Sequence, residues 1–257
     1  MPTIEIDGER VFYALHDVVR GGAPLVLVHG AGENHLVWPA PLRRLPDVRV
    51  VVVDLPGHGK SGGAGRRSVA EYVAFLAQLL DALKIERAAI AGHSMGGAIA
   101  QQFGLTYPAR TAALILIATG ARLRVAPQIL ELAGTDLAAA ADLISRLQWG
   151  PGTPEQMIRL GHQQLLANRP DVIHGDYLAC NAFDVMDRLA EIRAPTLVIG
   201  GAADQLTPPR YASFLAERIP GAQLVLIDGA GHMVMLEREE AVARAVDRFL
   251  RDQGLPG

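Results

Sequence analysis

The chain has 257 residues, of which 50% are hydrophobic and 20% are charged, so its composition is that of a globular protein and excludes a disordered chain. It carries 24 Lys and Arg residues against 27 Asp and Glu residues, and the net charge of −3 excludes a strongly basic, nucleic-acid-binding protein. The single cysteine, Cys180, excludes an intrachain disulfide and a cluster of thiolate metal ligands.

The sequence lacks the pattern of a membrane span or an export signal. The longest wholly apolar run, residues 112–118, is far shorter than the ~20 residues that cross a bilayer. The first residues do not combine a basic segment with a following apolar one. We therefore expect a cytoplasmic protein that binds neither a membrane nor nucleic acid. Its oligomeric state is not indicated by the sequence.

Short apolar runs predict the strands of a buried sheet. Residues 3–6 and 11–16 predict an antiparallel hairpin that turns at Asp7-Gly8. Six further runs are near-continuous rather than alternating, which is typical of parallel strands covered on both faces. These runs are residues 25–28, 48–53, 88–91, 114–117, 196–199 and 224–227.

Helical patterns lie between the predicted strands. Apolar residues recur at helical spacing over residues 69–83, and Ser68 with Glu71 forms a capping box at the start. Further helices are predicted after Ser94 and over residues 242–249. Strands that alternate with helices predict an α/β fold, with a mostly parallel sheet and helices on both faces.

Residues 120–183 interrupt this alternation. They contain stretches of helix-forming residues without a strand pattern, and we interpret them as a helical insertion. These stretches are residues 128–133, 137–147 and 154–167. The predicted organisation is therefore a core of residues 1–119 and 186–257, with a helical cap of residues 120–185.

A serine between glycines follows the third of the six predicted parallel strands. Gly92-His93-Ser94-Met95-Gly96 matches the G-x-S-x-G nucleophile elbow, and it lies between a strand and a helix as that motif requires. A sharp turn crowds the backbone around the serine, so small residues are needed beside it. The alternative role for Ser94 is that of an ordinary helix cap.

A nucleophilic serine needs a base, and the base needs an acid that orients it. In this type of sheet we expect both on loops after later strands, in the order Ser, Asp, His. Asp204 follows the predicted strand 196–199, and His232 follows the predicted strand 224–227. Asp228 is the alternative acid, although it is close to His232 in sequence.

An oxyanion hole requires two backbone N–H groups that point at one position. Met95, the residue after the serine, would supply one of them. The loop after the strand 25–28 would supply the other, and we expect Ala31 to be the donor, with Gly32 as the alternative. His29, at the start of this loop, is expected to hold the loop through its ring nitrogens.

Two nucleotide-binding motifs are matched in part, but the residues around them do not fit either motif. Gly57-His58-Gly59-Lys60-Ser61-Gly62 satisfies G-x-G-x-x-G, but three residues separate it from its strand and the next helix starts only near Val69. A P-loop would need glycine where Asp54 stands. His58 is interpreted as a turn residue. Since the eight histidines show no metal-ligand spacing, we expect neither a metal nor a cofactor.

Together these segments resemble the α/β-hydrolase superfamily over nearly the whole chain. The matching pieces are the His29-Gly30 loop, the Asp54-to-Ser61 segment, the Ser94 elbow, Asp204 and Gly231-His232. The chain is similar to small capped members, which are bacterial carboxylesterases, enol-lactone hydrolases and C–C bond hydrolases. Haloalkane dehalogenases and epoxide hydrolases carry an aspartate at the elbow, so Ser94 argues against both.

The resemblance implies a serine hydrolase that cleaves a small to medium carboxylic ester through an acyl-enzyme on Ser94. The alternatives are an enol-lactone hydrolase, a C–C bond hydrolase, a lyase that uses the same three residues, or a ligand receptor with weak hydrolysis. The fold itself does not select the substrate. Apolar side chains of the cap and the catalytic loops should line the pocket. We expect Gly32, Trp149, Phe183, Leu206 and Met233 there, and Arg122 or Arg124 could pair with a substrate carboxylate.

Overall fold

The structure is a computed structural model that describes residues 2–16 and 22–255, and within them eight strands form one sheet in the order β1-β2-β4-β3-β5-β6-β7-β8. The strands are β1 (Thr3–Ile6), β2 (Glu9–His16), β3 (Leu25–Val28), β4 (Val50–Val53), β5 (Ala88–His93), β6 (Thr111–Ile117), β7 (Thr196–Gly201) and β8 (Gln223–Ile227). From β4 to β8 the neighbouring strands run parallel, whereas β1 and β2 pair antiparallel. The predicted mostly parallel sheet is confirmed.

The hairpin of β1 and β2 turns where the sequence predicted. Asp7 and Gly8 have φ angles of 51° and 77°. Two successive positive φ angles are typical of the tight hairpin turn whose twist matches that of the strands.

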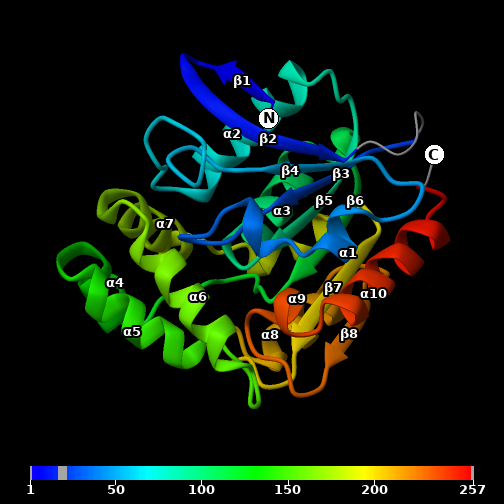
Figure 1. The fold of residues 1–257 in the computed structure, drawn as a ribbon. Helices are drawn as coiled ribbons and strands as arrows, with labels where there is room; N and C mark the ends of the chain where they lie inside the picture. Colours follow the sequence, from blue (N-terminus) through cyan, green and yellow to red (C-terminus); the bar gives the residue numbers. More distant parts are fainter. Residues whose placement is uncertain (1, 17–21, 256–257) are drawn as a thin grey trace.

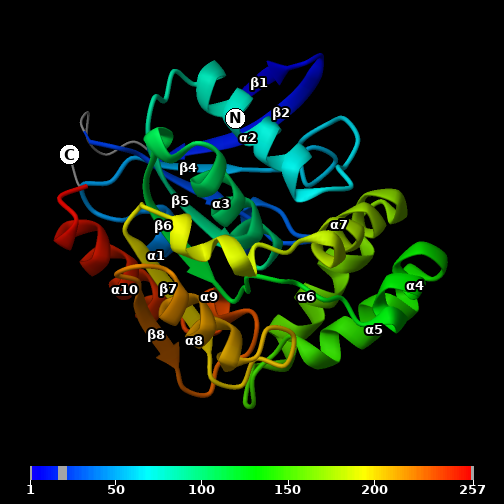
Figure 2. The same cartoon turned by 180° about the vertical axis from the view of Figure 1, so that it is seen from behind.

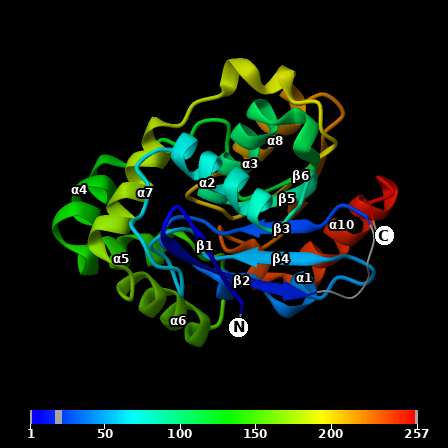
Figure 3. The same cartoon turned by 90° about the horizontal axis from the view of Figure 1, so that it is seen from above.

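Helices cover both faces of the sheet, as predicted. In Figure 3, α2 (Val69–Ala82), α3 (Met95–Thr106) and α8 (Pro209–Arg218) lie on one face, and α1 (Ala40–Arg43) and α10 (Glu239–Asp252) lie on the other. Successive side chains of β3 alternate between two apolar clusters, Val26 and Val28 in one and Leu25 and Leu27 in the other. Since both faces are covered, every position of this strand is apolar.

Four helices follow β6 and precede β7, and we call residues 120–185 the inserted segment. The helices are α4 (Pro127–Thr135), α5 (Leu137–Leu147), α6 (Glu155–Leu166) and α7 (Pro170–Ala182). They lie together at one side of the sheet, away from α10 (Figures 1 and 2). Their apolar side chains, among them Ile129, Ile144 and Ile173, form a cluster separate from the two clusters of the sheet.

The fourth helix of this segment, α7, was not among the predicted stretches. Its buried residues include Gly175 and Asp176, so the sequence of its inward face lacks the continuous apolar stripe that predicts a helix. The remaining short elements are η1 (His35–Val37), η2 (Pro108–Arg110), η3 (Met186–Glu191) and α9 (Val234–Glu237). In the described part of the chain, no helix combines the length and the apolar character needed to cross a membrane.

Asp54, directly after β4, anchors the loops beside the sheet. Its carboxylate is fully buried and accepts hydrogen bonds from the His35 backbone N–H (2.6 Å), His35 Nδ1 (2.9 Å) and the Lys60 N–H (2.8 Å). Burial disfavours the charged form, but these hydrogen bonds outweigh that effect and hold the pKa of Asp54 below its ordinary value of 3.8.

We expect Asp54→Asn to lower the free energy of unfolding by about 2–3 kcal/mol at neutral pH, because the amide group turns a donor toward donors that need an acceptor. A lowered folded pKa stabilises the protein above the unfolded value of 3.8 and loses this effect as pH falls through the folded value. Urea unfolding at pH 7, 5 and 3 should therefore give equal losses at the first two pH values and a smaller one at the third. The exposed Asp187→Asn is the control, and an equal loss at pH 3 would contradict the role of the charge.

Candidate active site

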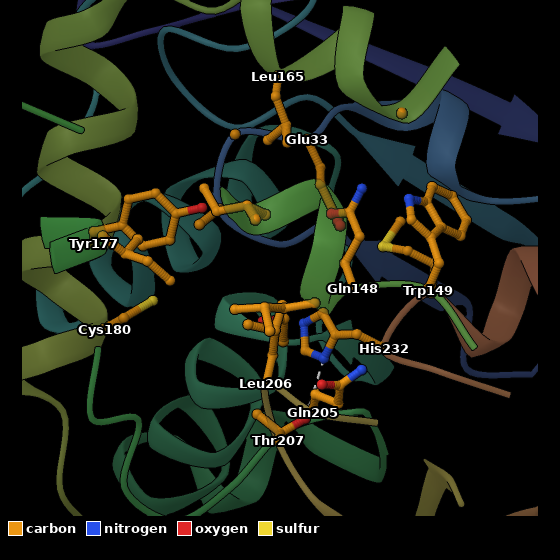
Figure 4. A pocket seen from close by; sticks show the side chains of 18 of the residues that line it. Glu33, Gln148, Trp149, Leu165, Tyr177, Cys180, Gln205, Leu206, Thr207 and His232 are labelled. Atoms are coloured by element: carbon orange, nitrogen blue, oxygen red, sulfur yellow. Dashed lines mark hydrogen bonds between the residues drawn. The ribbon is translucent and has the colours of Figure 1, made fainter. Parts of the chain in front are cut away.

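The predicted site residues follow strands β3, β5, β7 and β8 at their carboxyl ends, which meet at one edge of the parallel sheet. There Ala31, Ser94 and His232 line a single cavity of about 840 Å³. The inserted segment supplies the opposite wall, with Leu165 and Tyr177 among its lining residues. Figure 4 shows His232 beside Thr207, facing this space.

The turn at Ser94 is strained in the way a nucleophile elbow requires. Ser94 has φ 50° and ψ −113°, a conformation that side-chain-bearing residues seldom adopt, and its side chain makes no capping hydrogen bond to α3. The alternative role of Ser94 as a helix cap is therefore wrong. A Cβ atom on Gly92 would collide with the Gly96 carbonyl, and one on Gly96 would collide with the Val28 carbonyl. Both glycines are thus required by the close approach of the backbone.

Asp204 and His232 meet although 28 positions separate them. His232 Nδ1 donates to Asp204 Oδ2 over 2.9 Å, so Nε2 is the ring nitrogen that takes no part in this bond. Burial disfavours the Asp204 carboxylate, but His232 and the hydrogen bonds from Thr207 outweigh burial and lower the pKa of Asp204. The alternative acid, Asp228, is exposed at the end of β8.

Sequence reasoning missed two groups that hold Asp204 and His232, one at the side chains and one at the backbone. The Thr207 hydroxyl donates to Asp204 Oδ2 over 2.7 Å and lies 3.2 Å from His232 Nδ1. The available signal was the Asp-x-x-Thr spacing, which is typical of a side chain that closes a turn. Gln148 of the inserted segment accepts the His232 backbone N–H through its carbonyl oxygen over 2.9 Å.

Among Gly30, Ala31 and Gly32 of the loop after β3, only the Ala31 N–H has no acceptor in the described part of the chain. The Gly30 N–H donates to Glu33 Oε2 (2.6 Å), and the Gly32 N–H donates to Asp176 Oδ2 (2.9 Å). Within the described residues, the Ala31 N–H has no hydrogen-bond acceptor, and neither has the Met95 N–H. Because Gly32 is already engaged, this geometry favours Ala31 over the alternative Gly32 as the predicted oxyanion donor.

A buried histidine–carboxylate pair that sequence reasoning missed joins this loop to the elbow. His93 Nδ1 is 3.0 Å from Glu33 Oε2, and His93 Nε2 is 3.0 Å from the His232 carbonyl oxygen. Burial lowers the pKa of His93, but the Glu33 carboxylate outweighs burial and raises it. Both ring nitrogens of His93 thus lie against an acceptor oxygen, and His93 joins the elbow, the Glu33 loop and the His232 loop.

The two other loop histidines have structural contacts. His29 accepts the Leu55 N–H at Nε2 (3.0 Å) and donates from Nδ1 to the Gly30 carbonyl oxygen (2.8 Å), as expected of a loop-holding residue. Burial lowers the pKa of His29 to about 4, so it is neutral. His58 holds its own turn through the Pro56 carbonyl oxygen, and its Nε2 lies 2.7 Å from Asp176 of the inserted segment.

Four of the five predicted pocket residues line the cavity, namely Gly32, Trp149, Leu206 and Met233. The prediction for Phe183 was wrong, because Phe183 comes directly after α7 and packs into an apolar cluster of the sheet instead. Arg122 bonds to Asp184 over 2.6 Å and does not line the cavity, whereas Arg124 does. The free thiol of Cys180 is buried in the cavity wall, and burial raises its pKa.

Known proteins resemble this chain over almost its whole length. The 2-hydroxy-6-oxononadienedioate/2-hydroxy-6-oxononatrienedioate hydrolase of Burkholderia vietnamiensis is 31% identical over 95% of this chain and 93% of its own. The structure of a thermophilic esterase has a TM-score of 0.88, with 33% identity and 98% of each chain covered. The enol-lactonase from Burkholderia xenovorans has a TM-score of 0.90, with 27% identity, and covers 97% of this chain and 100% of its own.

A model of the alpha/beta hydrolase family matches residues 25–245, which include Ser94, Asp204 and His232. This range is most of the chain and spans the sheet from β3 to β8. The resemblance stated from the sequence is thereby confirmed, and the chain is a hydrolase that belongs to the alpha/beta hydrolase family.

Proposed function

We propose that this protein is a serine hydrolase that cleaves a small to medium carboxylic ester, with Ser94 as nucleophile, His232 as base and Asp204 as the orienting acid. The observation that carries the proposal is the cavity shared by Ser94 and His232, together with the hydrogen bond from His232 Nδ1 to Asp204. In the first step, His232 Nε2 takes the proton of Ser94 Oγ while Oγ attacks the ester carbonyl carbon.

The attack converts the carbonyl oxygen into an oxyanion, which the Ala31 and Met95 N–H groups stabilise. His232 then gives its proton to the leaving alkoxide, and the acyl group remains on Ser94. Water repeats the cycle, with His232 again as the base, and releases the carboxylic acid. Because its pKa is lowered, Asp204 stays ionised and stabilises the imidazolium throughout.

The inserted segment acts as the cap in this proposal and supplies most of the substrate-binding wall. Its lining side chains are largely apolar, among them Leu123, Ile129, Ile144, Met157 and Leu165. An apolar wall of this kind suits the hydrocarbon part of a substrate, while the few polar groups near Ser94 hold the carbonyl. The ester is therefore expected to carry an apolar acyl or alcohol group.

A substrate with a remote carboxylate is the second candidate. Arg124 and Arg210 both line the cavity, so an anionic group could pair with either. A dioate cleaved at a C–C bond has such a group, as would an enol-lactone that bears a carboxylate substituent, and two of the related proteins above are named for a dioate and an enol-lactone. A lyase that uses the same base without an acyl-enzyme is the third alternative.

The experiment is a substrate screen combined with covalent labelling. We expect turnover of p-nitrophenyl esters above that of lactones and vinylogous diketones, a burst of p-nitrophenol, and stoichiometric labelling of Ser94 by a serine-directed phosphonate. Arg124→Gln should leave neutral esters unaffected and should raise KM only for substrates with a remote carboxylate. Turnover without a burst or labelling would favour the lyase, and preferred turnover of lactones or diketones would select the second candidate.

A further inference from the structure

The inserted segment holds one residue of the loop after β3, Gly32, by hydrogen bonds to both its N–H and its carbonyl oxygen. Asp176, on α7, accepts the Gly32 N–H over 2.9 Å, and Asn168, between α6 and α7, donates from Nδ2 to the Gly32 carbonyl oxygen over 2.7 Å. Ile173 packs against the same glycine, where an added Cβ atom would meet its side chain at 2.7 Å. Gly32 itself has φ 65°, which is a conformation that favours glycine.

Asp176 is in turn fixed by the core. Its carboxylate is fully buried and receives the Tyr72 hydroxyl on Oδ1 (2.5 Å), while His58 Nε2 lies 2.7 Å from Oδ2. Burial disfavours a charged His58, but the Asp176 carboxylate outweighs burial and raises the pKa of His58. These contacts fix the position of the Asp176 carboxylate, and the carboxylate in turn fixes the Gly32 N–H that donates to it.

The Ala31 N–H lies between two anchored peptides. On one side, Glu33 of the core holds the Gly30 N–H. On the other side, Asp176 and Asn168 of the inserted segment hold Gly32. The direction of the Ala31 N–H thus depends on contacts from both parts of the molecule, and only one of the two anchors belongs to the core.

From these contacts we infer that Asn168 and Asp176 are positioning residues, which fix the direction in which the Ala31 N–H points. Through them, catalysis depends on how the inserted segment packs against the loop after β3. The inference rests on the proposed role of the Ala31 N–H. Neither side chain lines the cavity, so neither needs to touch the substrate. If the segment lifts, Gly32 loses both hydrogen bonds at once, and the transition state loses an aligned donor while the substrate pocket keeps its other groups.

The test compares kcat with KM and transition-state affinity with ground-state affinity. An alkyl trifluoromethyl ketone reports the oxyanion hole, because Ser94 Oγ adds to its carbonyl carbon, the Ser94 proton moves to His232 and the carbonyl oxygen becomes the oxyanion. The corresponding secondary alcohol fills the same pocket without forming an oxyanion. For Asn168→Ala we expect kcat for a p-nitrophenyl ester to fall by about 10–100-fold, with KM within about twofold. Affinity for the ketone should fall by a similar factor, and affinity for the alcohol should be unchanged.

Asp176→Asn keeps the side-chain shape and is the second variant, expected to act in the same direction if Asn168→Ala does not fold. The matched control is Asp136→Ala, which removes the N-cap of α5 in the same segment and touches neither Gly32 nor the cavity. Melting temperatures are measured for all three variants. Asp136→Ala should keep kcat and ketone affinity within about twofold even where its melting temperature falls.

Three outcomes would overturn the inference. These are unchanged kcat and ketone affinity in both positioning variants, a rise in KM alone, or an equal loss of kcat in Asp136→Ala. Phosphonate labelling of the wild-type protein separates this failure from that of the proposed function. If Ser94 is labelled while the variants stay fully active, only the positioning role is wrong. If wild-type Ser94 is not labelled, the proposed function itself fails.

Discussion

Ser94→Ala is expected to lower kcat for ester hydrolysis by about 10⁴–10⁶-fold, because the acyl-enzyme route disappears while substrate binding and the oxyanion donors remain. The fold should be nearly unaffected. Ser94 makes no side-chain capping bond, and the strained backbone around it is held by the Ser94 N–H to the Ile117 carbonyl and by the Thr119 hydroxyl to the Ser94 carbonyl. Neither bond involves the hydroxyl that the substitution removes.

The measurement is kcat and KM for a p-nitrophenyl ester, with circular dichroism and melting temperature to confirm folding. Ser61→Ala is a useful comparison, since the Ser61 hydroxyl donates to the Asp54 carbonyl and accepts the Phe12 N–H outside the cavity. It should reduce stability and leave most of the activity. A folded Ser94→Ala protein that kept a tenth of wild-type activity would show that the nucleophile was assigned wrongly.

Asp204→Asn is expected to lower kcat by about 10³–10⁴-fold. The Asp204 carboxylate accepts His232 Nδ1 and the Thr207 hydroxyl on Oδ2, and two backbone N–H groups on Oδ1. An amide in its place can turn a donor toward His232, which selects the wrong tautomer, and it cannot stabilise the imidazolium. KM should change little, because Asp204 does not line the cavity.

The matched control is Asp228→Asn, which makes the same chemical change at an exposed position on the chain between β8 and His232. It should keep kcat within about twofold, because surface substitutions away from special contacts have small effects. Steady-state kinetics of both variants, with a melting curve for each, give the ranking. A larger loss in Asp228→Asn than in Asp204→Asn would move the orienting acid to Asp228.

The sequence alone was sufficient for features that depend on near neighbours in the chain. Continuous apolar runs predicted the parallel strands, because both faces of those strands are buried. The glycines beside Ser94 predicted the elbow, because the requirement for small residues lies within the turn itself. The order of Ser94, Asp204 and His232 then followed from the strands that precede them, since parallel strands present their carboxyl ends at one edge.

The side-chain partners of these residues became known only from the folded structure. The bond of Gly32 to Asp176 spans 144 positions and that of His58 to Asp176 spans 118, so no local pattern could have indicated either contact. The choice of Ala31 over Gly32 follows from the first of these bonds, and the exclusion of Phe183 from the cavity follows from the path of the chain after α7. Periodicity and turn chemistry act over a few residues, whereas hydrogen bonds between distant segments exist only after packing has brought those segments together. The local patterns of the chain were therefore enough for the sheet and the order of the site residues, whereas the packing of the inserted segment against the core sets how the loop after β3 is held.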